Sequence, residues 1–343
     1  MSIKTTGRNP SGMALDKLKQ SPNYKSKGFE NFSPTPMMLQ DSSYYELLLK
    51  YFKKEPNAKP SRPLPSVKTN LHDIGTGKPS IVWFGHSSYL INFMEKRFLI
   101  DPVMSGFASP VSCMVKAFDG ADAYTVDDLP PIDYLVITHD HYDHLDYKTI
   151  MRLKGKVKHV YTSLGVGSHL IYWGFDAATV HELDWWQSAQ LENNITITAT
   201  PARHFSGRGF KRFKTFWSSF VLNAGDHKLF VGGDSGYDSH FREIGERFGG
   251  FDIALLESGQ YNSAWPLIHM MPEETVKAAI ELKSKTLMPV HWGKFTLAMH
   301  AWNEPVERVL AEASKKGLQV TTPMIGEKVV LDSYYPDSAW WNF

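Results

Sequence analysis

The chain has 343 residues, with 37 Lys and Arg against 36 Asp and Glu and a formal net charge of +1. Its 42% hydrophobic content fits a soluble globular protein, and this charge balance supplies no basic field to gather nucleic acid, which disfavours a nuclease and any nucleic-acid partner. The single cysteine, Cys113, excludes an intrachain disulfide and a thiolate metal cluster, so any metal must be held by histidines and carboxylates.

Residues 1–18 contain no apolar run after the first basic residue, which excludes a secretory signal and a lipidation motif and predicts a cytoplasmic location. No later segment is apolar over the length needed to cross a bilayer, so any membrane contact would be peripheral. Layered β folds often exceed the usual domain size. We therefore expect an N-terminal extension over residues 1–78 and one catalytic domain over residues 79–343; the oligomeric state is open.

The extension is predicted to have three parts. Residues 1–40 are rich in Ser, Pro, Asn and Lys, which indicates a loosely ordered arm that takes its structure from the core. In residues 41–54, Asp41 can cap a short helix with apolar residues at helical spacing, and we expect this helix to pack on the core rather than on a membrane surface. The closely spaced prolines of residues 56–65 predict an extended linker.

The catalytic domain is predicted to combine strands with helices. Short runs of β-branched and aromatic residues predict strands at 80–85, 88–93, 97–102, 133–138, 158–163, 195–201, 218–224, 227–233, 251–257 and 286–291. Helical spacing of apolar residues predicts helices at 147–154, 165–173, 238–248, 272–283 and 304–316. This order favours sheets with helices outside them, and there is no repeat of solenoid or propeller period.

Directly behind the predicted strand 133–138 lies a dense run of potential metal ligands. His139 and His141 are two residues apart, so in extended backbone they face one metal together. A following turn can aim Asp143 and His144 at a second position. A chance cluster of solvated histidines is the alternative, but this arrangement after a buried strand favours metal binding.

The run His139-x-His141-x-Asp143-His144 resembles the signature of the metallo-β-lactamase superfamily. The resemblance implies an α+β fold, a four-layer αβ/βα sandwich, and two Zn²⁺ ions per chain. It also implies further ligands at later strand ends, and three residues occupy such positions in the expected order: His204, Asp234 and His291. By this resemblance one zinc is bound by His139, His141 and His204, the other by Asp143, His144 and His291, and Asp234 bridges them. Each late residue alone would more often be structural.

A narrower resemblance covers residues 80–305. The sequence is similar there to the N-acyl-phosphatidylethanolamine-hydrolysing phospholipase D branch and its bacterial relatives, in the segments WFGHSSYLIN, LIDPVMSGFASP, THDHYDHLD, ELDWW, GDSGY, HMMPEE and HWGKF. Two regions depart from that branch. The region before residue 80 is not strongly matched, and residues 257–260 replace a more apolar sequence.

In that branch, residues at the positions of Tyr142 and His269 contact substrate. Tyr142 lies between ligands on a short turn, so we expect its phenol near the metals, donating to a phosphoryl oxygen; the alternative is a packing tyrosine. His269 precedes Pro272 and an acidic pair that suit a first helical turn, which places it in a loop. There it can bind phosphate or protonate a leaving alkoxide, or act only as a hydrogen-bonded loop histidine.

Further residues are expected beside the metals without binding them. His86 and Asp101 follow early strands and are candidates to orient ligating histidines, although a structural role fits each equally well. Several apolar residues can line a lipid-accommodating wall, although core filling is their commoner use: Trp185, Trp186, Met270, Met271, Trp340, Trp341 and Phe343.

Together these features predict a zinc-dependent hydrolase with Asp143, Asp234 and His269 as catalytic residues. Two zinc ions would hold a bridging hydroxide that attacks phosphorus. The resemblance implies a phosphodiesterase of phospholipase D type acting on N-acyl-phosphatidylethanolamine or a similar lipid-like diester. The alternatives are a lactonase or other carboxylic ester hydrolase, and a non-catalytic metal-binding protein that engages a partner.

Overall fold

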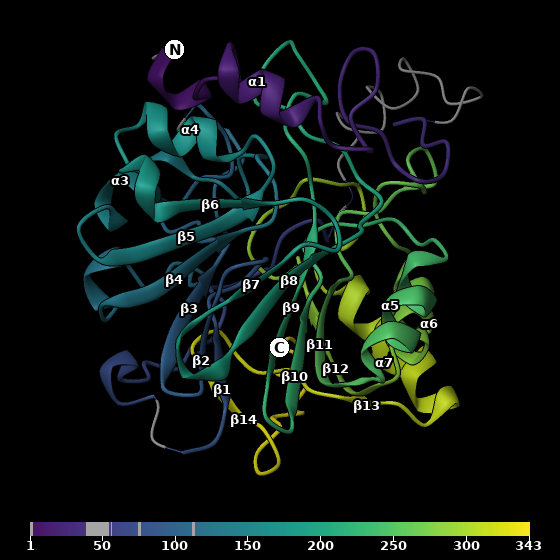
Figure 1. Ribbon diagram of the computed structural model, residues 1–343. Coiled ribbons are helices and arrows are strands. Elements are labelled where there is room, and N and C mark those ends of the chain that lie inside the picture. The colour runs from purple at the N-terminus through teal and green to yellow at the C-terminus, as the bar shows by residue number, and fades with distance from the viewer. Residues whose placement is uncertain (1–2, 39–54, 56, 75–76, 112–113) are drawn as a thin grey trace.

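The computed structural model describes residues 3–38, 55, 57–74, 77–111 and 114–343. Two seven-stranded sheets face each other, and helices lie outside each sheet (Figure 1). This arrangement confirms the expected four-layer sandwich. It arises because the strands are apolar on both faces, so each sheet must be covered twice.

The first sheet has the strand order β14-β1-β2-β3-β4-β5-β6. Its strands are β1 (Ser80–Trp83), β2 (Tyr89–Phe93), β3 (Lys96–Ile100), β4 (Ile132–Ile137), β5 (Val157–Ser163), β6 (Val180–Leu183) and β14 (Lys328–Val330). The sheet is antiparallel from β14 to β3 and parallel from β3 to β6. Helices α3 (Tyr147–Leu153) and α4 (Gly167–Tyr172) follow β4 and β5 and share an apolar cluster with this sheet.

The second sheet has the order β13-β12-β11-β10-β9-β8-β7. Its strands are β7 (Ser188–Gln190), β8 (Thr196–Thr200), β9 (Ser219–Ala224), β10 (His227–Val231), β11 (Phe251–Glu257), β12 (Ser284–Val290) and β13 (Gln319–Val320). Strands β7 to β10 are antiparallel and β10 to β13 parallel. Three helices cover its outer face: α5 (His240–Phe248), α6 (Pro272–Glu281) and α7 (Glu304–Lys316) (Figure 1).

Strand alternation separates the inner core from the outer cores. In β1, Ile81 belongs to the core between the sheets, whereas the next residue, Val82, packs on the side of α3 and α4. In β11, Leu255 faces the other sheet and Leu256 faces the helices. The ten predicted strands and five predicted helices are all present. The sequence prediction missed the short strands β6, β7, β13 and β14, whose residues are mostly only partly buried.

The N-terminal arm crosses one end of the sandwich (Figure 1). It contains α1 (Met13–Leu18), and it buries Leu18 and Phe29 against Phe216 and Trp217. The described part of the arm, residues 3–38, is therefore held against the core by apolar side chains. The helix predicted for residues 41–54 lies outside the described residues. Short 3₁₀ turns occur at Ile3–Thr6, Leu71–Asp73, Val126–Asp128, Ala177–Thr179 and Glu192–Asn194.

Tryptophans from the C-terminal segment fill the core, which confirms core filling as their use. The Trp340 ring stacks on Trp292 with ring centroids 5.2 Å apart and also packs against Trp83. Trp341 is buried in the same cluster, whereas the Phe343 side chain is partly exposed. Earlier in the chain, Trp185 is buried with the residues that hold the arm, and Trp186 stacks with Arg247.

No helix among residues 3–38, 57–74, 77–111 and 114–343 has the length and apolar character needed to span a bilayer.

We predict that Trp340→Ala lowers the free energy of unfolding by about 3–5 kcal/mol, because it empties a packed position that the surrounding rings cannot fill. Urea unfolding followed by circular dichroism measures this change. Met13→Ala is the control, since Met13 is 90% exposed, and it should change stability by roughly 0.5 kcal/mol or less. Equal effects of the two variants would contradict the assigned role of Trp340.

Candidate metal centre

The seven predicted ligands converge at one edge of the two sheets, because each lies just beyond the C-terminal end of a strand. The loop after β4 carries four of them: His139, His141, Asp143 and His144. His204 follows β8, Asp234 follows β10 and His291 follows β12. Residues that are 152 positions apart in sequence, from His139 to His291, therefore meet at one site.

One group of possible ligands consists of His139, His141, His204 and Asp234, whose donor atoms lie within 4.8 Å of one another. His141 Nδ1 lies 2.9 Å from His139 Nε2 and 3.2 Å from His204 Nε2. Asp234 Oδ2 completes the group at 3.8 Å from His139 Nε2 and 3.7 Å from His204 Nε2. Three imidazole nitrogens and one carboxylate oxygen match a zinc ligand set.

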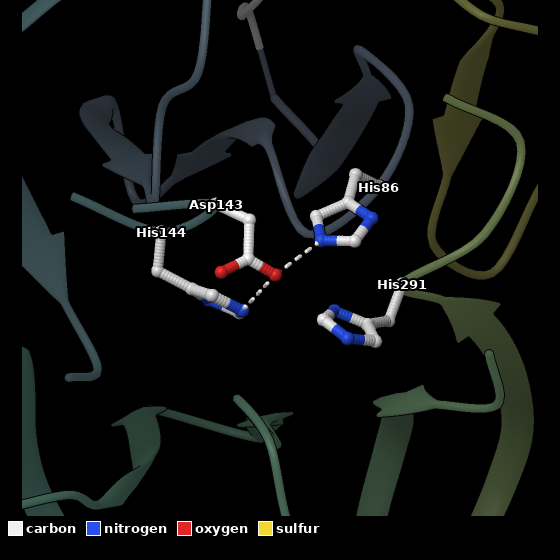
Figure 2. Close-up of side chains that lie close together, drawn as sticks. All are labelled: His86, Asp143, His144 and His291. Carbon is white, nitrogen blue, oxygen red and sulfur yellow. Dashed lines mark hydrogen bonds and ion pairs between the residues drawn. The ribbon is translucent and has the colours of Figure 1, made fainter. Parts of the chain in front are cut away.

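A second group within the same limit contains His86, Asp143, His144 and His291 (Figure 2). Asp143 Oδ2 lies 2.9 Å from His86 Nε2 and 3.6 Å from His144 Nε2. Asp234 adjoins this group through its other oxygen, because Oδ1 is 3.1 Å from His144 Nε2 and 3.2 Å from His291 Nδ1. Asp234 thus presents one oxygen to each group, as a bridging ligand would.

His86 lies closer to the cluster than the sequence suggested. It was expected to orient a ligand, and its Nε2 does contact the Asp143 carboxylate. The same ring is also placed to offer a nitrogen to a metal in the second group. Its opposite nitrogen, Nδ1, has no hydrogen-bond partner among the described residues.

The residues present fit a metal pair. Four buried atoms of the cluster make no well-aligned hydrogen bond within the described parts of the chain: His86 Nδ1, His144 Nε2, Asp234 Oδ1 and His291 Nε2. Of these, His144 Nε2 and Asp234 Oδ1 lie 3.1 Å apart as an ion pair, and the two other atoms have no polar partner among the described residues. Buried polar atoms are rarely left without a partner, so unpaired atoms gathered at one place indicate a missing ligand such as a cation. The donor set contains only imidazole and carboxylate groups, which suit divalent metals of the zinc and iron type.

The charges at the site lead to the same conclusion. Burial lowers the pKa of His139, His204 and His291 well below its usual range, so these rings are neutral, the form that binds metal. Burial raises the pKa of Asp234 to about 6. Burial alone would lower the pKa of His144, but nearby carboxylates raise it well above its usual value: Asp234, Asp143 and Asp101. Three carboxylates that gather around one histidine create a negative potential, which stabilises a bound metal ion.

Hydrogen bonds from neighbouring residues fix the ligand rings. The Asp101 carboxylate lies 2.8 Å from His144 Nδ1 and also accepts from the Thr138 backbone N–H at 2.9 Å. His204 Nδ1 lies 2.8 Å from the Ile268 carbonyl oxygen. These contacts leave Nε2 of both histidines for a metal, and they place Asp101 beside a ligand as predicted.

The loops of the site hold unfavourable backbone conformations. His86, Asp101 and His291 have φ values of 54°, 39° and 68°, in the left-handed region that non-glycine residues seldom adopt. The first and last of these are joined, because the His291 N–H donates to the His86 carbonyl oxygen at 3.0 Å. Gly259 is packed so closely that an added Cβ would lie 2.2 Å from the His291 carbonyl oxygen. Strain of this kind is common where side-chain placement matters for function.

A cavity of about 210 Å³ opens over the metal ligands. One part of its lining consists of His141, Asp143, Asp234, His269 and His291. The rest of the lining is mostly apolar: Phe205, Trp265, Ile268 and Leu297, with Gln260. The cavity therefore combines the candidate metal ligands with an apolar part of its lining.

His269 lies at the site as expected, and a buried glutamate holds it. His269 Nδ1 is 3.0 Å from Glu257 Oε2, and Glu257 Oε1 accepts from the Met270 N–H at 2.7 Å. Glu257 is fully buried, and burial raises its pKa well above the usual range. The sequence marked this glutamate only as a departure from a related family. Its partner could not be identified without the fold.

Tyr142 is placed differently from the expectation. Its hydroxyl donates to the Arg208 carbonyl oxygen at 2.5 Å, and the Arg208 guanidinium lies over its ring at 4.1 Å. The phenol lines a small neighbouring cavity with Thr5 and Lys148 and is not part of the lining of the metal cavity. The Tyr142 hydroxyl, expected to donate a hydrogen bond to a phosphoryl oxygen, donates to a backbone carbonyl oxygen instead. Substrate binding by Tyr142 remains a prediction.

Two further contributors were missed by the sequence analysis. Asn31 of the N-terminal arm holds the backbone of His204 on both sides, accepting from its N–H at 3.0 Å and donating to its carbonyl oxygen at 2.8 Å. Asp140 accepts from the Gly207 N–H at 2.7 Å and from Thr215 at 2.9 Å, which ties the β4 loop to the loop after His204. No sequence spacing links these pairs.

A family model described as the Beta-lactamase superfamily domain matches residues 96–292, more than half of the chain. The chain belongs to the metallo-β-lactamase superfamily. The four-layer sandwich is therefore the metallo-β-lactamase fold. Together with the clustered histidines and aspartates, membership of this superfamily identifies the protein as a metal-dependent hydrolase.

The chain is similar to two curated proteins and to one solved structure that illustrate its relationships. An uncharacterized protein of Mycobacterium tuberculosis is 39% identical over 329 residues, covering 94% of this chain and 88% of the relative. The N-acyl-phosphatidylethanolamine-hydrolyzing phospholipase D 1 of Caenorhabditis elegans is 32% identical over 63% of this chain and 64% of its own length. Igni18, a metallo hydrolase of Ignicoccus hospitalis, superposes with a TM-score of 0.58 at 22% identity over 75% of this chain and all of its own.

We predict that Asp101→Asn weakens metal binding roughly 10- to 100-fold, because the amide cannot fully replace the carboxylate that orients His144. Competition with a chromogenic chelator measures the affinity. Asp226→Asn is the control, since this aspartate is exposed in the β9–β10 turn. Unfolding of the metal-free proteins separates lost affinity from lost stability. Unchanged affinity in folded Asp101→Asn would exclude the orienting role.

Proposed function

We propose that the protein is a phosphodiesterase of phospholipase D type that acts on N-acyl-phosphatidylethanolamine or a similar lipid-like diester. The observation that carries this proposal is the metal cavity with its apolar wall of Phe205, Trp265, Ile268 and Leu297. Such a cavity can receive a polar diester next to the start of a hydrocarbon chain. The partial similarity to the Caenorhabditis elegans phospholipase supports the same substrate class.

The metals of this proposal are two zinc ions, held by the two groups of histidines and aspartates that share Asp234. When bound, such a pair supplies Lewis acidity toward the diester oxygens and lowers the pKa of a coordinated water. The identity of the metal is tested by loading the metal-free protein with zinc, iron or manganese separately and measuring both the bound metal and the turnover.

His269 is the residue that we assign to the substrate. Because Glu257 engages its Nδ1, the ring is held in the cavity lining with Nε2 left for a ligand. At that position it can hydrogen-bond a phosphoryl oxygen or protonate the departing alkoxide. Glu257 acts through His269 and is therefore a positioning residue.

The substrate assignment is tested by incubating zinc-loaded protein with N-acyl-phosphatidylethanolamine in mixed micelles. We expect phosphatidate and N-acylethanolamine in equal amounts, detected by mass spectrometry. A chelator-treated sample is the control. A panel of lactones and carboxylic esters is run in parallel, and faster turnover of any of these than of the diester would replace the phosphodiesterase assignment with an esterase or lactonase.

We predict that His269→Ala lowers kcat on the diester by roughly 10²-fold or more while the bound metal is unchanged. Glu257→Gln keeps the size of the side chain and should cause a smaller loss of kcat with little change in KM. His72→Ala, at an exposed position outside the site, is the control and should keep full activity. Loss of metal together with activity in His269→Ala would show that His269 is a ligand instead.

A further inference from the structure

A surface beside the metal cavity combines two exposed aromatic rings, those of Phe32 and Phe210, with basic side chains and the partly buried Phe213. The arm contributes Lys27 and Phe32, and the loop after His204 contributes Phe210, Lys211, Arg212, Phe213 and Lys214; we name these seven residues the cationic-aromatic surface. We propose that this surface docks the protein on an anionic phospholipid bilayer, next to the entrance of the metal cavity. The role of docking in substrate supply rests on the proposed function.

Exposure is the first observation. The Phe210 side chain is fully exposed, and the Phe32 side chain is 58% exposed although its ring packs against Trp185. Exposed phenyl rings cost free energy in water, and their concentration on one face indicates an interaction site. A ring that protrudes from a loop, rather than lying in a groove, suits insertion between lipid headgroups.

The loop is built to present its tip. At its base, the Phe213 N–H donates to the Ser206 carbonyl oxygen at 3.0 Å, and the Ser206 hydroxyl donates to the Thr215 carbonyl oxygen at 2.6 Å. Arg208 points inward instead, donating to the carbonyl oxygens of Asp140 and Leu145. Residues 209–212 are exposed beyond this fixed base. The tip is thus held outward, and no apolar residue in the described part of the chain covers Phe210.

The positive charge of the cationic-aromatic surface favours an anionic partner. The arm and the loop line a cavity of about 570 Å³, and its lining within residues 3–38 and 114–343 contains Lys27, Arg212 and Lys214 but only one acidic residue, Glu30. The adjacent Lys211 adds a further exposed positive charge. Basic residues interspersed with phenyl rings complement a surface that is anionic outside and hydrocarbon below. The chain as a whole has a net charge of +1, so the positive charge is local rather than a general nucleic-acid field.

The surface is continuous with the metal site. The Arg212 guanidinium lies 5.6 Å from the ring centre of Phe205, which lines the metal cavity. On the arm side, Asn31 is hydrogen-bonded to the backbone of the predicted ligand His204. A bilayer bound at the cationic-aromatic surface would therefore present its headgroups close to the metal ligands.

Vesicle flotation with the full-length, zinc-loaded protein tests the docking. We expect binding to vesicles of phosphatidylcholine mixed with phosphatidylglycerol, little binding to phosphatidylcholine alone, and loss of binding at high salt. Lys211→Glu should weaken partitioning by roughly fivefold or more, since one basic residue near an anionic surface contributes about that factor. Phe210→Ser should weaken partitioning by at least roughly the same factor, because it removes the ring that would be buried between lipid headgroups. Met13→Ser and Lys315→Glu, at exposed positions on helices α1 and α7, are the matched controls and should bind as the unmodified protein does.

Hydrolysis of a water-soluble, short-chain diester separates docking from catalysis. The Phe210→Ser and Lys211→Glu variants should keep full turnover on it while losing turnover on vesicles. Absent vesicle binding by a protein that hydrolyses the soluble diester overturns the docking proposal and leaves the proposed function intact. Phe210-dependent vesicle binding without diester hydrolysis supports docking and refutes the proposed function. Binding that depends on Phe210 but prefers single-stranded RNA to vesicles also overturns it.

Discussion

The buried carboxylate of Asp234 is the point on which the site depends. It lies between two groups of histidines and faces one group with each oxygen. A charge in this position is costly unless cations are bound on both sides, because little water can reach it. The same burial keeps His139, His204 and His291 neutral and leaves atoms of the cluster without a hydrogen-bond partner among the described residues. Hydrogen bonds from outside the cluster fix the position of His144.

The scaffold meets this requirement by bringing many strand ends together. Strands β4, β8, β10 and β12 come from both sheets, and each ends within four residues of a predicted ligand. The sheets themselves are ordinary in construction, with apolar side chains on both faces. Among the strained positions are His86 and His291 at the metal edge, where the backbone adopts conformations that a well-packed scaffold must impose. The two packed sheets therefore hold the loops that carry the predicted metal ligands.

Much of this architecture could be predicted from the sequence, and the limits have physical causes. The strong apolar periodicity of β4 and α7 marked their existence and type, whereas β7 and β13 are too short and too exposed to carry such a signal. The run from His139 to His144 was recognisable because its ligands are neighbours in sequence. Asn31 and Glu257 were not, because their importance comes from contacts with His204 and His269 that only the folded chain creates. The direction of the Tyr142 phenol could not be predicted for a similar reason, because the Arg208 carbonyl oxygen that accepts its hydrogen bond lies on a loop distant in sequence.

The contact between Asn31 and His204 also bears on how the molecule assembles. These residues are separated by 173 positions, and Asn31 also accepts from the indole N–H of Trp217 at 2.9 Å. The ribosome synthesises Asn31 before His204 and Trp217, so the arm must wait for the second sheet before it can dock. Closing such a long loop carries a large entropic cost that early folding steps cannot recover. Completion of the hydrolytic centre is therefore a late event in maturation, and a nascent chain without its second half holds only part of it.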